Sequence, residues 1–302
     1  MFCHNCGVSL KPQKKQRSRG VQVLLTLLVC LGYIGIYFGI TLLVEFVYSM
    51  IVMSKSGMLT VPGAEPDSNF FRLFYEHFSE MDIIASLLTL AVFAIILKAT
   101  KKSIKDEIRL NSIPTGSFVS LALFGVSAQV VVTVLISVLY SLKPSLSEYS
   151  AGEELNGIFE YGGHVTVFLC IAVVVPLLEE TLFRGLVYAN LRKVFPVPAS
   201  VIISAVIFGA AHGNLEQFAY AVVLGIVLAY VYEKFDSLWA SFAIHMAFNG
   251  ASFLMSLFES NDGGDFLVPV FFVSLGIMMV TSLYFFKVNY KSIKAGTEDE
   301  AV

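Results

Sequence analysis

Charged residues are scarce in this chain. Only 14% of its 302 residues are Asp, Glu, Lys or Arg, whereas 56% are hydrophobic. A soluble globular domain has about 25% charged residues. The deficit therefore argues against a soluble protein and favours a polytopic membrane protein.

Cysteine is also sparse, with four residues in the whole sequence. Cys3 and Cys6 form a pair near the N-terminus, while Cys30 and Cys170 lie within apolar stretches. Such scattered positions do not form a disulfide framework. Nothing in this pattern indicates an oxidised exterior domain, and no internal repeat or low-complexity segment is present.

Long apolar stretches make up most of the remaining sequence. A transmembrane helix needs roughly 20 mostly apolar residues. Eight stretches qualify or nearly qualify, at about 21–44, 81–97, 117–141, 165–188, 198–212, 217–232, 238–258 and 266–286. The first is longer than the apolar region of a signal peptide and lacks a small-residue cleavage site. The sequence thus predicts an all-α protein with eight transmembrane helices, the first of them retained.

The basic residues predict the orientation of these helices. Most of the 20 Lys and Arg residues fall in the segments that are cytoplasmic if the N-terminus is inside. Only Lys55, Arg72 and Lys143 fall in exterior loops, and Arg184 lies within a helix. Basic residues concentrate on the cytoplasmic side of membrane proteins. We therefore expect a multi-pass protein of the cell membrane with both termini in the cytoplasm.

Three polar clusters interrupt the apolar stretches, each in a different predicted helix. Ionisable side chains inside a membrane are costly and usually functional. The clusters are Glu179-Glu180-Thr-Leu-Phe-Arg184, Phe208-Gly-Ala-Ala-His212 and His245-Met-Ala-Phe-Asn249. A carboxylate, two imidazoles and an amide from separate helices are the components of a hydrolytic site.

Helical spacing predicts which of these side chains act together. Glu180 and Arg184 are four residues apart on one helical face, which favours an ion pair. Glu179 points elsewhere around the helix and has no partner of its own there. Pro176, one turn earlier, removes a backbone hydrogen bond and can kink the helix. The alternative interpretation of this cluster is a structural ion-pair network or a proton relay.

The other two clusters have the same four-residue spacing. The ring of Phe208 is expected to cover the face that presents His212, and Gly209 allows close helix approach. His245 and Asn249 share a face and are both potential donors to a developing oxyanion. Interhelical packing and hydrogen bonding are the alternatives for both pairs.

Two catalytic schemes fit the three clusters. In the first, Glu179, His212 and His245 bind a zinc ion whose fourth ligand is water. In the second there is no metal, and Glu179 acts as general base with His212 while His245 and Asn249 hold the oxyanion. Residue spacing alone does not separate these schemes.

The order of the motifs resembles one known family. Glu-Glu-x-x-x-Arg, Phe-x-x-x-His and His-x-x-x-Asn on successive helices look like the CAAX-processing type II and bacteriocin-processing (CPBP, or Abi) intramembrane proteases of bacterial type. The resemblance implies an eight-helix intramembrane endopeptidase, a hydrolase whose cavity opens toward the cytosol and the bilayer.

The same resemblance implies roles for the motif residues. Glu179 and His212 would activate water, and His245 and Asn249 would stabilise the oxyanion. Glu180, Arg184 and Phe208 would shape the site. A metal-free glutamate–histidine site is favoured over the zinc alternative, so no cofactor is expected in the active site.

A second resemblance concerns the N-terminus. Cys3-His-Asn-Cys6-Gly7 looks like the first half of a zinc ribbon, in which such a knuckle binds zinc. The second Cys-x-x-Cys is missing, so a complete site would need His4 or another chain. Structural zinc at Cys3 and Cys6 and a degenerate remnant are the two interpretations.

The expected organisation follows from these assignments. It comprises a cytoplasmic segment with the half knuckle (1–20), two helices with their loops (21–114), the protease core (115–260), and a last helix with a cytoplasmic tail (261–302). The expected partners are a protein or peptide substrate, lipidated or membrane-associated, and membrane lipid, but no nucleic acid. The alternatives from other classes are a catalytically silent immunity or regulatory protein and a proton-coupled transporter.

Overall fold

The computed structural model describes residues 18–55, 68–149, 152–257 and 264–287. Cys3 and Cys6 lie outside these residues, as do parts of the expected terminal segments and loops. The described residues form helices joined by short connections, without β-strands among them. The expectation of an all-α fold is confirmed.

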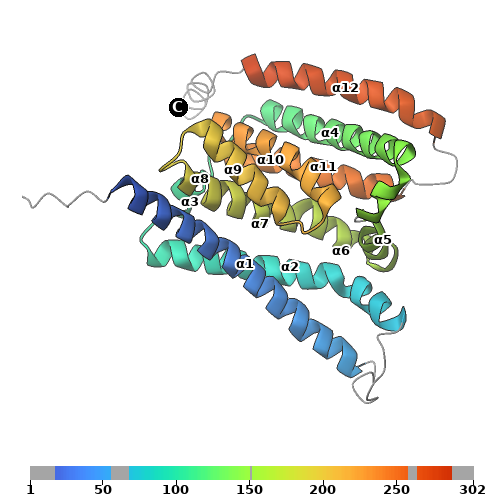
Figure 1. The fold of residues 1–302 in the computed structure, drawn as a ribbon, viewed down its shortest axis with the longest axis horizontal. Coiled ribbons are helices and arrows are strands. Elements are labelled where there is room, and N and C mark those ends of the chain that lie inside the picture. The colour runs from blue at the N-terminus through green and yellow to red at the C-terminus, as the bar shows by residue number, and fades with distance from the viewer. Residues whose placement is uncertain (1–17, 56–67, 150–151, 258–263, 288–302) are drawn as a thin grey trace, which may run out of the picture.

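The helices follow one another closely along the chain (Figure 1). Their bounds are α1 Arg19–Lys55, α2 Ser68–Ala99, α3 Ile104–Glu107, α4 Thr115–Leu142, η2 Pro144–Tyr149, α5 Gly152–Tyr161, α6 His164–Phe168, η3 Leu169–Val174, α7 Val175–Glu179, η4 Glu180–Tyr188, α8 Ala189–Leu191, α9 Val197–Ala210, α10 Leu215–Phe235, α11 Leu238–Leu257 and α12 Gly264–Lys287. The elements α6 to α8 form one continuous apolar span, His164–Leu191.

Each of the eight apolar stretches is helical, but they differ in length. Within the described residues, six helices are long and apolar enough to cross a membrane. The stretches in α9 and α12 are shorter, at Val197–Ala210 and Pro269–Phe285. With 14 residues, α9 is only about 21 Å long, compared with about 30 Å for a bilayer core. The chain is therefore a multi-pass, all-α membrane protein in which the expected count of eight full spans is too high by these length criteria.

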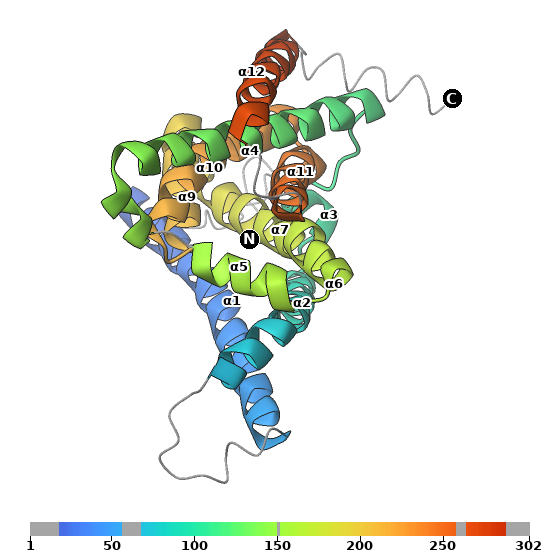
Figure 2. The ribbon, with the colours of Figure 1, turned by 90° about the vertical axis from the view of Figure 1, so that its right-hand side faces the viewer.

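The helices form layers that place the fourth to seventh apolar stretches in the middle (Figures 1 and 2). The pair α1 and α2 lies on one side, and α4 and α12 lie on the other, with α6 to α11 between them. The side chains of α1 include many exposed large hydrophobic residues, such as Leu24, Leu42 and Phe46. Such a surface is suited to contact with lipid.

Small residues allow the central helices to approach one another closely. A Cβ atom on Gly125 of α4 would lie 2.3 Å from the carbonyl oxygen of Ile244 in α11. On Gly209 of α9 it would lie 2.6 Å from Cγ2 of Val222 in α10. Neither position has room for a side chain, as is common at packed helix interfaces in membranes. The close approach expected at Gly209 is thus confirmed.

The span His164–Leu191 is not a regular α-helix. Segments η3 and η4 are π-helical, and the five-residue α7, which contains Pro176, separates them. In this register the Val175 N–H donates to the Cys170 carbonyl, five residues earlier. π-Helical turns are rare and frequently occur at functional sites. The irregularity predicted at Pro176 therefore takes the form of an under-wound helix on both sides of the proline.

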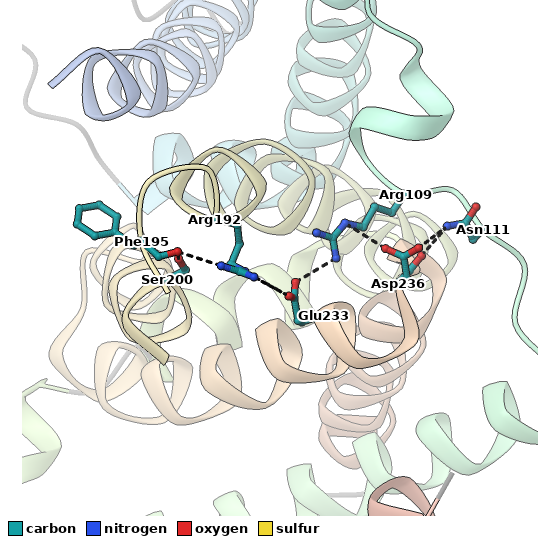
Figure 3. Close-up of polar contacts among 7 residues, drawn as sticks. All are labelled: Arg109, Asn111, Arg192, Phe195, Ser200, Glu233 and Asp236. Carbon is teal, nitrogen blue, oxygen red and sulfur yellow. Dashed lines mark hydrogen bonds and ion pairs between the residues drawn. The ribbon is translucent and has the colours of Figure 1, made fainter. Parts of the chain in front are cut away.

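One end of the bundle is held together by ion pairs (Figure 3). Arg109 contacts Glu233 at 3.1 Å and Asp236 at 3.3 Å, and Arg192 contacts Glu233 at 3.2 Å. The Asn111 amide donates to the Asp236 carbonyl at 2.8 Å. The segments between α3 and α4, after α8, and between α10 and α11 therefore meet. All three are segments that the basic residues assign to the cytoplasm, so they lie on the same side.

Candidate active site

The three polar clusters come together around one cavity of about 500 Å³. Glu179 at the end of α7 lines it, as do His212 just after α9 and His245 and Asn249 of α11, together with Phe208 of α9. Glu180 and Arg184 lie behind this wall, and both side chains are fully buried. The tertiary structure thus brings all seven predicted site residues into one region, with five facing the cavity.

The Glu180–Arg184 ion pair predicted from the four-residue spacing is confirmed. Arg184 Nη1 lies 2.7 Å from Glu180 Oε1, and neither side chain is exposed. The guanidinium carbon of Arg184 also lies 4.3 Å from the centre of the Phe208 ring. A cation over an aromatic face is attracted to the ring, more strongly where water is excluded. The buried charge of Arg184 is therefore compensated from two sides.

His245 lies between the two glutamates. Its Nδ1 is 2.9 Å from Glu180 Oε1, and its Nε2 is 3.4 Å from Glu179 Oε2. Because the ion-paired Glu180 carboxylate can only accept, Nδ1 carries a hydrogen. The Nε2 nitrogen and Glu179 then face each other across the 3.4 Å contact. Glu179, which has no partner in its own helix, therefore finds one in α11.

The ring of His212 is oriented by its own helix. Its Nδ1–H donates to the Phe208 carbonyl at 2.9 Å, since a carbonyl can only accept. In the neutral ring, Nε2 is then the nitrogen with a free lone pair. The Phe208 ring meets His212 edge-on at 4.9 Å and His245 at 5.7 Å. Phe208 therefore packs against both imidazoles, as the predicted site-shaping residue should.

Asn249 makes a contact that its spacing from His245 does not reveal. Its Nδ2 donates to the backbone carbonyl of Ile171 in η3 at 3.0 Å. One of the two amide hydrogens is therefore committed to the protein backbone. The side chain also lines the cavity, where the second hydrogen is the one available to a ligand.

Sequence reasoning missed the residues that the outer helices contribute to the cavity. Asp82 of α2 and Tyr37 of α1 line it, together with Gln129 of α4. The thiol of Cys170 lies 3.9 Å from Asp82 Oδ2. The sequence feature that could have predicted a contribution from α2 was Asp82, an acidic residue near the start of an apolar stretch.

The positions of potential ligands bear on the zinc alternative. Among residues 18–55, 68–149, 152–257 and 264–287, no group of three His, Cys, Asp or Glu side chains is arranged to hold a metal ion. Glu179, His212 and His245 therefore line one cavity without forming such a ligand set here. The dependence of the reaction on metal stays a prediction, as does zinc at Cys3 and Cys6.

Comparison with known protein families gives a match over the middle of the chain. Residues 162–251 match the family described as "Type II CAAX prenyl endopeptidase Rce1-like". This region, less than a third of the chain, is similar to the Rce1-like family. The Rce1-like region contains all seven predicted site residues and lies within the expected core of 115–260. The resemblance stated from the three motifs is confirmed.

A curated relative extends the same comparison. The chain is 28% identical over 86 residues to "Putative membrane peptidase YdiL" of Bacillus subtilis (strain 168). The aligned part is 28% of this chain and 35% of that protein, so the chain spans about a third of the length of this relative. No solved structure matches the chain. The helices α1, α2, α4 and α12 lie outside the Rce1-like region.

Proposed function

We propose that this chain is an intramembrane endopeptidase that hydrolyses peptide bonds in a membrane-associated or lipidated substrate. The observation that carries the proposal is the meeting of Glu179 and His212 in one cavity within an apolar bundle. A general base and an imidazole with a free nitrogen are the groups that activate a water molecule. The Rce1-like region and the similarity to a membrane peptidase support the same reaction class.

The contacts of these residues support a division of labour. Glu179 accepts a proton from water while the water oxygen bonds to the carbonyl carbon of the substrate. The C–N bond then breaks, and a proton passes to the leaving nitrogen. His212, whose Nδ1–H is held by the Phe208 carbonyl, presents Nε2 to take part in this transfer. His245 holds Glu179 from the other side through its 3.4 Å contact.

The oxyanion that forms in this reaction needs hydrogen-bond donors. We assign this role to the second amide hydrogen of Asn249, whose first hydrogen is anchored on Ile171. We assign the same role to His245, which lines the same cavity. Removal of one donor of this kind typically costs about 10²–10³ in rate.

A second cavity supports a lipidated substrate. It has a volume of about 550 Å³, lies among α4, α10, α11 and α12, and is lined almost entirely by apolar side chains. Val132, Ile136, Tyr220 and Leu224 line both this cavity and the catalytic one. A hydrocarbon chain in the apolar cavity would therefore place an attached peptide beside Glu179. Each buried CH₂ of such a chain contributes about 0.8 kcal/mol.

A cleavage assay tests the proposal. The purified full-length protein in lipid vesicles is incubated with matched peptides and lipopeptides, and products are identified by mass spectrometry. Cleavage by the wild type, its loss in Glu179→Gln and His212→Ala, and faster cleavage of lipidated peptides are expected. If neither peptide class is cut by folded wild-type protein, the silent regulatory protein becomes the better interpretation.

A further inference from the structure

Pro176 interrupts a backbone hydrogen-bond ladder one turn before Glu179. In η3 the ladder has the π register, since the Val175 N–H donates to the Cys170 carbonyl. The next donor in this register would be the N–H of residue 176, and its acceptor would be the Ile171 carbonyl. Proline has no N–H. The Ile171 carbonyl therefore has no backbone N–H partner in this register, and a carbonyl left without a donor inside an apolar bundle is costly.

The Asn249 side chain supplies a donor at this point. Its Nδ2 lies 3.0 Å from the Ile171 carbonyl oxygen. The next residue of α11, Gly250, lies beside Ala172 and Phe168, so the two helices are packed against each other at this point. The amide of α11 thus occupies the place of the missing proline N–H.

The same face of α11 also contacts the span beyond the proline. His245, one turn before Asn249, contacts Glu179 and Glu180. α11 therefore holds the span on both sides of Pro176, through Ile171 before it and through the two glutamates after it. A span that has lost a backbone hydrogen bond between these points would otherwise bend there.

We propose that Asn249 is a positioning residue whose amide replaces the hydrogen bond that Pro176 removes. Its bond to Ile171 holds the under-wound span against α11, and Glu179 is thereby kept at its place in the cavity wall. This role is distinct from donation to the oxyanion, because it acts through the helix that carries Glu179. The expected effect on turnover rests on the proposed peptidase function. The expected effect on thermal stability does not, because it can be measured without any activity.

A double-mutant cycle between positions 249 and 176 tests the proposal. Pro176→Ala restores a backbone N–H in register with the Ile171 carbonyl, so the Asn249 amide becomes dispensable for the ladder. Asn249→Ala and Asn249→Leu, the latter close in shape but without a donor, are made both in the wild-type chain and in the Pro176→Ala chain. Each of these proteins is purified in full length, and its thermal stability is measured in lipid vesicles.

We expect both Asn249 substitutions to lower the melting temperature clearly in the wild-type chain and by less than half as much in the Pro176→Ala chain. For turnover, Asn249→Ala should lower kcat about 10-fold more when Pro176 is present than in the Pro176→Ala chain, where a loss of about 10²–10³ should remain, with little change in KM. The remaining loss would be the oxyanion contribution. Ser252→Ala, on the same helix and cavity wall, is the matched control and should have equal effects in both chains.

Equal losses of stability in the two backgrounds would overturn the proposal, as would an unchanged melting temperature in Asn249→Ala with Pro176 present. Equal losses of kcat together with an unchanged melting temperature would assign Asn249 to the oxyanion alone. If Pro176→Ala does not give folded protein, Pro176→Leu restores the same N–H and takes its place. Absence of peptidase activity in the wild type would contradict the proposed function. The melting temperatures would still decide whether Asn249 replaces the hydrogen bond that Pro176 removes.

Discussion

The Nε2 atom of His245 lies 3.4 Å from Oε2 of Glu179, although the two residues come from helices far apart in the sequence. This contact determines how the adjacent glutamates differ. Glu180 is fully buried and bound to both Arg184 and His245, whereas the side chain of Glu179 is 12% exposed and lines the cavity. One glutamate is therefore part of the scaffold, and the other is accessible to a ligand.

Glu180→Gln should destabilise the fold. The substitution leaves the fully buried guanidinium of Arg184 without its carboxylate, and breaking a buried pair in this way costs about 3–5 kcal/mol. A second substitution, Arg184→Gln, should recover part of the loss because no lone charge then remains. Denaturation of the wild type and the two variants in detergent measures both effects. A double variant no more stable than Glu180→Gln would contradict the ion-pair explanation.

Glu179→Gln should instead fold about as well as the wild type and lose essentially all peptidase activity. The amide keeps the shape of the side chain and can still meet His245, but it cannot act as a general base. Melting temperature and cleavage rate are measured on the same preparation. If Glu179→Gln unfolds the protein while Glu180→Gln only slows it, the two roles are reversed.

Activity should survive metal chelation. The test uses protein in which Cys3 and Cys6 are both changed to Ser, so that any zinc measured by mass spectrometry reports on the catalytic cavity alone. We expect no stoichiometric zinc and unchanged turnover after chelation. Loss of activity that zinc specifically restores would assign Glu179, His212 and His245 as ligands.

Acid should weaken the contact between α3 and the segment after α8. Burial raises the pKa of Glu107, but hydrogen bonds and charges from Lys102 and Lys193 outweigh this effect and hold the pKa below its usual range. The stability that ionised Glu107 contributes is fully present above its unfolded-state pKa, about 4.3. It is lost as the pH falls through the lower folded-state pKa. Glu107→Gln should therefore be less stable than wild type at neutral pH but not at strongly acidic pH. Because Lys193 is 51% exposed, the difference should stay below about 1 kcal/mol.

The glutamine variant and the wild type are compared by thermal unfolding across this pH range. Asp106→Asn, on the same short helix, is the matched control for the removal of a carboxylate. A stability difference that persists at the acidic end would mean that the charge of Glu107 does not cause it.

Reporter fusions should locate the ion-paired end of the bundle in the cytoplasm. We expect cytoplasmic signals from fusions after Lys105, Lys193 and Lys294, and exterior signals from fusions after Gly63, Glu154 and Gly263. The first two sites flank segments that Arg109, Arg192 and Glu233 hold together, so they must report the same side. A cytoplasmic signal after Glu154 would contradict the proposed orientation.

Local periodicity was enough to predict the contacts that lie within one helix. Glu180 and Arg184 are neighbours on one helical face, and Phe208 and His212 are neighbours on another, because residues four apart are adjacent on any helix. The apolar stretches likewise predicted where the helices lie, since a helix in lipid must satisfy its own backbone. The number of full spans was overestimated, because the stretch at 198–212 forms only the 14-residue α9.

The sequence by itself determined the helical membrane fold, the family resemblance and the seven candidate site residues. Only the tertiary structure decided how α11 meets the span around Pro176, where His245 contacts both glutamates and Asn249 contacts Ile171. It also brought Asp82 to the cavity from outside the Rce1-like region. These contacts depend on the crossing of separate helices and on the π register, and spacing along one helix carries no information about either.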